Sequence, residues 1–556
     1  MKKYTLVLLV FLTLLAKIQA QQTVGLTLYS PDIYNGYTLF APVFSTSTYL
    51  IDNCGYMVHE WESAYKPAAS AYILENGNLL RTGDMNNQSF SGSEAGGIIQ
   101  MMDWNGNTIF SFDYSSNSYC LHHDIEYLPN GNILGIAWKI ITPSDALDHG
   151  RDPNLIPQIG IWLEQIVEFE ITSPSTADVV WEWNVEDHLI QDFDSTKANY
   201  GVVADHPEKI NFNYMTGNLV NMMDWIHLNT IDYNAELDQI VVSGIMFNEI
   251  WVIDHSTTIQ EAAGPKGGTY GRGGDLIYRW GNPAAYDRGT AANKILYGVH
   301  DVQWIEGDRP DAGKFLMLNN GNGRPAGDFS SIDIIDQPVD SMGFYHIVQG
   351  EAYGPTQLSW TFHQNGLPDP LYTGFMGGAS QLPNGNFLAC ESSEGRIIEI
   401  NSNKQLLWEY IVPVNHNGPI IQGTLPGGNR VFRASRFSAS YPGFTEKEFN
   451  EPVPIELNPF SSLCDTSIIT QINLVEEYDE IRLLSNPVGA ILILDNRSGE
   501  TVRIDVYNTL GTHLLSQRCL DPNISINAQR LKPGIYFIRS RGERSGVVNG
   551  FSFVKR

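Results

Sequence analysis

The chain has 556 residues, of which 42% are hydrophobic and 11% aromatic. This length predicts two to four domains, or one large repeat architecture with an appendage. The formal net charge of -28 argues against nucleic acid and against an anionic membrane surface as partners, because both repel an acidic protein.

Residues 1–20 have the pattern of a secretory signal peptide. Lys2 and Lys3 form a short basic region, residues 4–16 are apolar, and Ala20 is a small residue suited to precede a cleavage site. The apolar stretch is short for a membrane span. We therefore expect an exported chain, periplasmic in transit and then secreted or at the cell surface, without a membrane span when mature. An uncleaved membrane anchor is the alternative.

A recurring strand dominates the next four hundred residues. Short β-rich runs are separated by Gly, Asn, Asp and Pro, which predicts an all-β fold. One kind of run ends in aromatic residues and occurs at 57–61, 108–112, 179–183, 276–280, 358–362 and 406–410. Repetition at this spacing indicates that the fold is built from similar units.

A hairpin accompanies each aromatic strand, as in HDIEYLPNGNIL (123–134), and a further strand lies between the two. Four-stranded units in series predict a six-bladed β-propeller over residues 21–445. A third and a fourth strand (47–61) begin the series and a hairpin near 420–436 ends it, so we expect both ends to complete one blade. An open series of sandwiches is the alternative. Insertions at 186–212 and 256–275 are expected to be rim loops that shape a pocket.

The pattern changes after residue 445. Residues 446–479 are polar with several prolines and are predicted to be a linker, and residues 480–556 are predicted to form a small β-sandwich. The five cysteines include no pair with metal-type spacing and do not make a disulfide scaffold, so we expect mostly buried, inert thiols.

Three histidines share one position in the repeat. When the hairpins are aligned on their turns, the residues seven places before the turn are Ala69, His123, His227, His300, Gly377 and Ile420. The first strand of a propeller blade lines the central channel, so equivalent positions on neighbouring blades converge near the axis. This register predicts a functional site at His123, His227 and His300.

Neighbouring residues fit a site that handles anions. Asp124 and Asp301 directly follow their histidines and are expected either to hold an imidazole tautomer from behind or to form salt links between blades. Asn229 returns to the face of His227 and can donate hydrogen bonds. Arg433 and Arg436 are candidate guanidinium partners for an anion, or else ordinary surface arginines.

Several longer motifs carry a family resemblance over residues 25–445. These are HHDIEYLPNGNIL (122–134), DWIHLNTIDYNAELDQI (224–240), NEIWVIDHST (248–257), YRWGNP (278–283), GVHDVQWI (298–305), NNGNGRP (319–325) and FRASRFSASYPGF (432–444). Together they resemble the bacterial aryl-sulfate sulfotransferases, six-bladed propellers that move a sulfuryl group from one phenol to another.

The resemblance implies a role for each histidine. It implies that His300 is a nucleophile that becomes transiently sulfated, and that His227 and Asn229 bind the sulfuryl oxygens. A further histidine of that family matches the HHD strand, where the register favours His123 over His122, and His122 stays a substrate-binding candidate. His227 or His123 could act as general acid or base. The resemblance implies small phenolic substrates, no nucleotide donor and no cofactor.

One departure from the family pattern concerns an arginine. Members of the family carry an arginine beyond the DWxHxN motif, and the corresponding stretch here, 241–254, has none. Either Arg433 or Arg436 replaces it, or sulfuryl binding is weaker and the donor differs.

The C-terminal residues resemble the sorting domains read by the type IX secretion system of Bacteroidetes. The motifs are SNPV (485–488), IDVYNTLGTHLLS (504–516), LKPGIYFIRS (531–540) and a final basic FVKR. The resemblance implies that export machinery is a partner and that the domain takes no part in catalysis. A carbohydrate-binding or adhesion sandwich is the alternative.

Two other functions remain open for the histidines. Three convergent neutral imidazoles could bind zinc or iron in a metal-dependent hydrolase or oxygenase. The repeat could also be a non-catalytic propeller that binds a ligand or partner on its loops.

Overall fold

The computed structural model describes residues 22–90, 95–215, 222–364, 370–460 and 463–464, and 481–555 apart from 484–487, 489, 498, 509–512, 543 and 545–547. The expected signal peptide lies outside these residues. The chain divides into two compact units, Met1–Phe460 and Ser461–Arg556. Among the described residues, no helix is long and apolar enough to cross a membrane.

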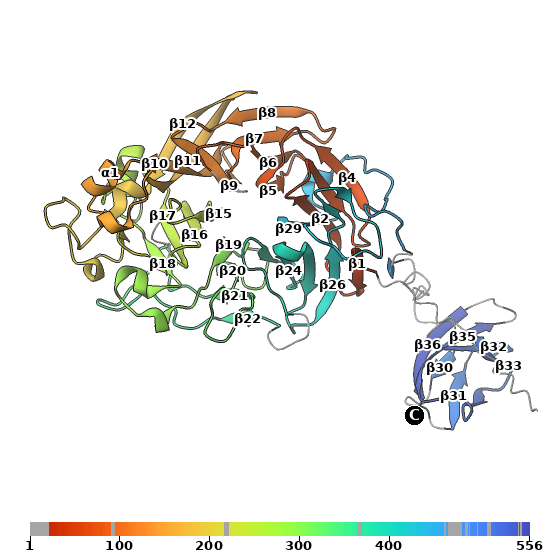
Figure 1. Ribbon diagram of the computed structural model, residues 1–556. Coiled ribbons are helices and arrows are strands. Elements are labelled where there is room, and N and C mark those ends of the chain that lie inside the picture. Colours follow the sequence, from red (N-terminus) through yellow and green to blue (C-terminus); the bar gives the residue numbers. More distant parts are fainter. Residues whose placement is uncertain are drawn as a thin grey trace, which may run out of the picture. The chain divides into compact units, whose positions relative to one another are not determined.

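The first unit consists mainly of four-stranded antiparallel sheets that follow one another along the chain. Four of them contain β5 (Pro67–Ile73), β6 (Leu79–Asp84), β7 (Gly97–Met102) and β8 (Thr108–Asp113); β9 (Tyr119–Tyr127), β10 (Ile133–Ile141), β11 (Ile161–Ser173) and β12 (Thr176–Asn184); β15 (Leu228–Asn234), β16 (Gln239–Gly244), β17 (Glu249–Asp254) and β18 (Tyr278–Trp280); and β19 (Val299–Trp304), β20 (Phe315–Asn319), β21 (Ser331–Ile335) and β22 (Trp360–Phe362). Figure 1 shows the sheets around a common centre, with β5, β9, β15 and β19 toward the middle.

Two further sheets contain strands from both ends of this unit. In one, β23 (Gly378–Gln381), β24 (Phe387–Glu391), β25 (Arg396–Ile400) and β26 (Leu406–Ile411) are joined by β1 (Gly25–Tyr29). In the other, β29 (Val431–Ser438) pairs with β2 (Gly36–Pro42), which is followed by β3 (Ser47–Ile51) and β4 (Met57–Glu62). The N- and C-terminal parts of the unit are therefore joined by β-pairing.

The strand pairing corrects one detail of the sequence prediction. The C-terminal end contributes one strand, β29, to the shared sheet rather than a hairpin, and the second strand is β2 at Gly36–Pro42. Ile420 lies outside the strands, where its neighbour Ile421 bridges Leu457. The hairpin alignment failed here because its turn, residues 423–428, connects an irregular segment to β29 and not two strands of the sheet.

The recurring aromatic strand is the fourth strand of each sheet, and its tryptophans bind the next sheet. The indole N–H of Trp61 donates to Asp103 O, that of Trp183 to Gly274 O, that of Trp280 to Pro355 O and that of Trp408 to Asn53 O, at 2.6–3.0 Å. Each acceptor lies between the third and fourth strands of the following sheet. A buried indole N–H needs such a partner, so the repeated tryptophan is a connection between sheets.

The two long insertions fold against each other. Residues 186–212 contain β13 (Leu189–Ile190) and β14 (Ile210–Asn211), and residues 256–275 contain the short helix α2 (Ile259–Ala262). The carboxylate of Asp275 accepts hydrogen bonds from His188 at 2.8 Å and Lys209 at 2.6 Å. The other short helix, α1 (Pro143–Asp148), lies in the loop between β10 and β11.

The first unit ends later than the sequence predicted. Residues 446–460 pack on it: Trp104 Nε1 donates to Glu448 O, Phe449 stacks on Tyr37, and Asn450 N donates to Val58 O. The boundary is therefore at Phe460 rather than at 445. Prolines and charges made this segment resemble a linker, although Phe449 packs on the first unit.

The second unit has two antiparallel sheets. One contains β30 (Ile481–Leu483), β31 (Ile491–Asn496) and β34 (Asn523–Asn527), and the other contains β33 (His513–Cys519), β32 (Val502–Asn508), β35 (Gly534–Gly542) and β36 (Val548–Lys555). Buried residues from both sheets, among them Leu494, Ile504 and Ile524, form one apolar cluster. This arrangement agrees with the predicted sandwich.

The cysteines differ in state. Cys120 and Cys390 are buried free thiols and Cys519 is a half-buried one, as expected for inert residues. Cys54 and Cys464 each belong to a disulfide, which the sequence did not predict.

Candidate active site

The three histidines of the shared register lie at or next to distortions of inner strands. His123 and His300 belong to β9 and β19, and His227 directly precedes β15. The ladders of all three strands are interrupted there. His123, His227 and Asp301 have φ of 50°, 57° and 56°. A bulge with left-handed backbone is costly for a non-glycine residue and redirects its side chain, so this strain marks a candidate site.

The structure brings the three imidazoles together. The ring centroids of His123 and His227 are 4.6 Å apart. The ring of Phe432, on β29, lies 5.9 Å from that of His123 and 6.3 Å from that of His300. The predicted register therefore identifies residues that are neighbours in space.

His300 is buried, and both of its ring nitrogens are in hydrogen bonds. Asn320 donates through Nδ2 to Thr373 O and Met376 O, so its Oδ1 accepts from His300 Nδ1 at 2.7 Å. Nδ1 therefore carries the hydrogen, and Nε2 accepts from the backbone N–H of Met376 at 3.1 Å. Burial, with smaller effects from the charges of His227 and Arg433, lowers the pKa of His300 to about 3. The imidazole is neutral, with its lone pair on Nε2.

His227 is the partly exposed member of the group. Its side chain is 18% exposed, whereas the whole residues His123 and His300 are 1% and 2% exposed. Its Nδ1 is in a short hydrogen bond with Asp224 Oδ2. Asp224 therefore fixes the orientation of this imidazole.

His122 lies between His123 and Glu164. Its Nδ1 is 2.7 Å from His123 Nδ1, and its Nε2 is 2.9 Å from Glu164 Oε2 on β11. The ring stacks on Trp138 at 3.9 Å between centroids. Neighbouring residues of a regular strand point to opposite faces, and the bulge at His123 allows both rings to meet.

The two aspartates that follow the histidines bind Arg433. Arg433 Nη1 lies 2.9 Å from Asp124 Oδ2 and 3.3 Å from Asp301 Oδ1. The guanidinium also donates to Tyr72 Oη at 2.8 Å and to Thr230 Oγ1 at 3.3 Å. Of the two expectations for these aspartates, their described contacts match the link between sheets. From β29, Arg433 reaches residues of the β5, β9, β15 and β19 sheets.

Arg436 and Asn229 have structural partners. Arg436 is paired with Glu399 at 2.6 Å and donates to Thr38 Oγ1 at 2.8 Å, beside Trp408. Asn229 donates to Val299 O at 2.8 Å, while its Oδ1 accepts from Thr230 and Ser243. Their polar groups hold neighbouring strands and sheets together.

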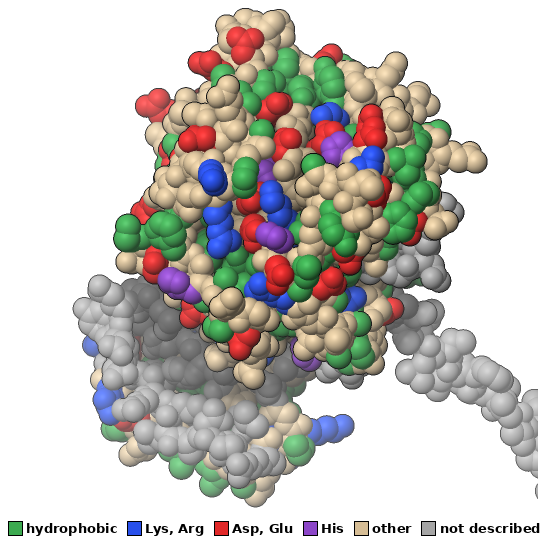
Figure 2. Space-filling view, turned by 90° about the vertical axis from the view of Figure 1, so that its left-hand side faces the viewer, with side chains coloured by type: hydrophobic (Ala, Val, Ile, Leu, Met, Phe, Trp, Pro, Cys, Tyr) green, Lys and Arg blue, Asp and Glu red, His purple; other side chains and the backbone are tan. Residues whose placement is uncertain are grey.

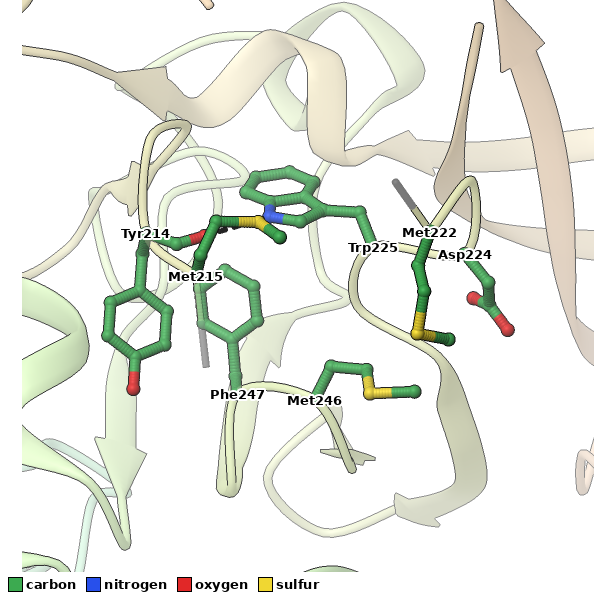
Figure 3. Close-up of a pocket in the computed structure, with 7 residues that line it drawn as sticks. All are labelled: Tyr214, Met215, Met222, Asp224, Trp225, Met246 and Phe247. Carbon is green, nitrogen blue, oxygen red and sulfur yellow. Dashed lines mark hydrogen bonds between the residues drawn. The ribbon is translucent and has the colours of Figure 1, made fainter. Parts of the chain in front are cut away.

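An apolar pocket adjoins Asp224. Figure 3 shows it lined by Tyr214, Met215, Met222, Asp224, Trp225, Met246 and Phe247. The centre of a water molecule has only about 10 Å³ available, which is room for roughly one water. Methionine side chains are flexible and contact aromatic rings well, so their movement can enlarge this space.

Charge on the molecular surface is mixed. Figure 2 shows acidic, basic and histidine side chains interspersed on one face. The net charge of -28 therefore does not make this face uniformly acidic.

Several site residues escaped the sequence analysis. Asn320 lies in the NNGNGRP motif and Asp224 in the DWIHLN motif, so quoted motifs contained both. Glu164 sits in a strand without any such pattern. Within the described part of the chain, no group of three or more His, Cys, Asp or Glu side chains is arranged to hold a metal ion.

The fold and site define a mostly β protein with serial four-stranded sheets around a buried histidine cluster. The chain belongs to the Arylsulfotransferase (ASST) family, because the sequence model of that family matches residues 30–333, more than half of the chain. Residues 485–551 match the secretion system C-terminal sorting domain. A domain of that kind is read by the type IX secretion machinery and indicates export to the cell surface or secretion.

Comparison with individual proteins adds less. No curated protein matches the chain. Solved structures with some likeness include a proposed 6-phosphogluconolactonase from Bacteroides fragilis NCTC 9343 (8% identity, 74% of this chain and 99% of that one, TM-score 0.32). Another is the dihydro-heme d1 dehydrogenase NirN, with 10% identity over 90% of this chain and 78% of that one and a TM-score of 0.29. A third is PorZ, a surface component of the type IX secretion system of Porphyromonas gingivalis, with 9% identity over 94% of this chain and 74% of that one and a TM-score of 0.19.

Proposed function

We propose that this protein is an aryl-sulfate sulfotransferase, which moves a sulfuryl group from a phenolic sulfate ester to a phenol through a transient sulfohistidine at His300. No nucleotide donor takes part. The observation that carries this proposal is the neutral, oriented imidazole of His300, whose Nδ1–H is bound by Asn320 and whose Nε2 keeps its lone pair. Family membership supports the reaction class.

The fold that we propose is a closed six-bladed β-propeller. Pairing of β29 with β2 joins the two ends of the unit. The Trp408 indole of the β26 strand binds Asn53 of the β29 sheet in the same way that earlier tryptophans bind the sheets that follow them. Arg433 binds residues of four other sheets near the centre.

The chemistry begins with attack of His300 Nε2 on the sulfur of the ester, in line with the departing phenolic oxygen. The new S–N bond forms as the S–O bond breaks, and the imidazole becomes positive. Asn320 Oδ1 stabilises that charge by accepting the Nδ1–H bond. An acceptor phenol then attacks the sulfur and restores His300, so one transfer is divided into two easier steps.

Donors to the sulfuryl oxygens come from groups beside Nε2. The Met376 N–H lies 3.1 Å from Nε2 and is displaced by the incoming sulfur, which leaves it next to the sulfuryl group. His227, whose Nδ1 is bound by Asp224, is a second donor through Nε2–H when its ring is an imidazolium. Arg433 and Arg436 are committed to carboxylates, so they do not take the place of the absent family arginine. Oriented donors of this kind stabilise developing negative charge.

The aromatic ring of the substrate occupies the methionine pocket in this proposal. Substrate approaches from the side of His227, where the cluster is exposed, and Asp224 joins His227 to the pocket wall. The sulfur atoms of Met215, Met222 and Met246 suit contact with an aryl ring.

The test is release of 4-nitrophenolate from 4-nitrophenyl sulfate by the full chain, with and without phenol as acceptor. We expect acceptor-dependent release that the His300→Gln variant loses by at least about 10³-fold. His59→Gln is the matched control, because His59 is also a buried histidine, stacked on Trp104. Equal activity of His300→Gln and wild type contradicts the assignment of His300 as the nucleophile.

The alternative functions give different outcomes in the same assay. Activity that disappears with chelator and returns with zinc or iron indicates a metal-dependent hydrolase or oxygenase. No turnover with any aryl sulfate, together with binding of one, indicates a non-catalytic propeller.

A further inference from the structure

We propose that Glu164 is the proton store of a relay, Glu164–His122–His123, which gives a proton to the departing phenol and recovers it from the acceptor phenol. The inference rests on the proposed sulfotransferase function and deepens it, because it explains how the phenolic proton is handled. Glu164 acts through the two histidines and is therefore a positioning residue rather than one that touches the substrate.

The relay is a continuous chain of close contacts. Glu164 Oε2 is 2.9 Å from His122 Nε2, and His122 Nδ1 is 2.7 Å from His123 Nδ1. The three residues are at most 1% exposed. Among the contacts that the described residues make, none occupies His123 Nε2, so this nitrogen is the end of the chain that can meet a substrate oxygen.

The relay has two possible arrangements of its hydrogens in which both imidazoles are neutral. In the first, Glu164 is a carboxylate that accepts from His122 Nε2–H, His122 Nδ1 accepts from His123 Nδ1–H, and His123 Nε2 is a base. In the second, Glu164 is protonated and donates to His122 Nε2, His122 Nδ1–H donates to His123 Nδ1, and His123 Nε2–H is an acid. The states differ by one proton, and neither contains an imidazolium.

Burial favours these neutral forms. The pKa of His123 is well below its ordinary value, chiefly through desolvation and then through the neighbouring His227, His122 and His300. The pKa of Glu164 is well above its ordinary value, chiefly through desolvation and then through Asp224. An excess proton is therefore held better on the Glu164 carboxylate than on the His123 ring.

The relay balances both half-reactions. As the S–O bond breaks, the phenolate oxygen takes the hydrogen of His123 Nε2, His122 Nδ1 passes its hydrogen to His123 Nδ1, and Glu164 passes its hydrogen to His122 Nε2. The phenol leaves neutral, and Glu164 becomes a carboxylate opposite a sulfohistidine without net charge. The acceptor phenol reverses every transfer when it attacks the sulfur.

The far end of the relay is tied to the other site histidine. Glu164 Oε1 accepts a hydrogen bond from the backbone N–H of Leu228 at 2.9 Å, one residue after His227. The carboxyl group is thus held in place whichever state the chain adopts. Ionisation of Glu164 also strengthens its bond to Leu228, the first residue of β15, which directly follows His227.

The experiment compares leaving groups in the full chain with Glu164→Gln. Phenyl sulfate releases a phenol with a pKa of about 10, close to that of a tyrosine side chain, and depends on protonation. 4-Nitrophenyl sulfate releases a much stronger acid and depends on it little. In a single turnover without acceptor, which isolates release of the leaving group, we expect Glu164→Gln to lose about 10²-fold or more in rate with phenyl sulfate and less than about threefold with 4-nitrophenyl sulfate.

Controls separate the relay from folding and from the reaction class. Glu168→Gln changes a buried carboxylate of the same strand, which is bound to Asn130, Asn132 and His255, and should keep the wild-type ratio of the two rates. If Glu164→Gln does not fold, His122→Gln interrupts the same chain and should show the same selective loss. An unchanged ratio in the folded variants overturns the relay, whereas wild-type protein inactive with every aryl sulfate overturns the proposed function instead.

Discussion

His300 Nδ1 and Asn320 Oδ1 are joined by a 2.7 Å hydrogen bond between β19 and the residue after β20. The same amide binds the carbonyls of Thr373 and Met376 through Nδ2. The network orients one imidazole from three segments of the chain and fixes which nitrogen carries the hydrogen. Orientation of this quality is what a nucleophile needs.

Asn320→Ala should reduce the rate of sulfuryl transfer by about 10–100-fold, because the imidazole of His300 is then no longer held in line with the sulfur. The KM for the donor should change less than kcat, since Asn320 does not touch the substrate. Steady-state kinetics check both values. Asn322→Ala is the control, because Asn322 is an exposed residue of the same motif that binds Gly374 O and Tyr372. Equal loss in both variants contradicts the assignment.

Arg433→Met should lower the free energy of unfolding by about 3–5 kcal/mol, because it leaves Asp124 and Asp301 buried without their cation. Urea denaturation measures this change. Arg430→Met, which removes an arginine over the Phe375 ring, should have a much smaller effect. An unchanged stability with a raised KM for the donor would show instead that Arg433 binds the sulfuryl group.

Stability should fall as the pH falls from about 6.5 toward 3. The pKa of His300 is about 3 in the folded protein and near 6.5 when unfolded, so only the unfolded chain binds the proton within this window. Within this window, each such histidine lowers the free energy of unfolding by about 1.4 kcal/mol for every unit by which the pH falls. Urea denaturation at several pH values should show that His300→Asn loses less stability than wild type. Parallel curves for the two proteins refute the assignment.

Met246→Ala should widen the pocket beside Asp224. We expect kcat/KM for 2-naphthyl sulfate to rise about tenfold relative to phenyl sulfate, because a few methylene-sized groups decide the fit of an apolar ligand. Competition between the two donors measures the ratio. Met342→Ala is the control, since Met342 is 70% exposed. If the ratio of the two kcat/KM values does not change, the aryl ring binds outside this pocket.

A chain ending at residue 445 should be less stable than one ending at Phe460. The shorter chain loses the Phe449 ring that stacks on Tyr37 at 4.7 Å and the carbonyl of Glu448 that binds Trp104. Phe449 is partly buried, so its loss should cost less than the about 3 kcal/mol or more typical of a fully buried aromatic. Thermal denaturation of both chains under reducing conditions, which removes any effect of the Cys54 disulfide, checks the difference. Identical curves would restore the linker boundary at 445.

The β-rich repeat and the histidine register could be predicted because both are local. A strand, a turn and an aromatic strand follow one another within each repeat, so their pattern is visible in the chain. His123, His227 and His300 were found together because equivalent places in repeated units occupy equivalent places in space. The tryptophans of the fourth strands are visible for the same reason, although their carbonyl partners are not.

The assignment of β2 failed for the opposite reason. Gly36–Pro42 pairs with Val431–Ser438 across almost four hundred residues, and the register of that pairing leaves no trace in either segment. Arg433 was identified as a candidate anion ligand, and its actual partners lie on strands far apart in the sequence. The contact between His122 and His123 depends on the bulge of β9 at His123.

The sequence by itself determined a repeated β architecture, the positions of three histidines and the C-terminal sorting domain, because these depend on short-range patterns of polarity and turn residues. Tertiary structure alone decided which groups touch: Arg433 with two aspartates, Asn320 with His300, and Glu164 with His122. Such contacts join strands that meet only when the sheets assemble, and the chemistry of a buried imidazole depends on these neighbours.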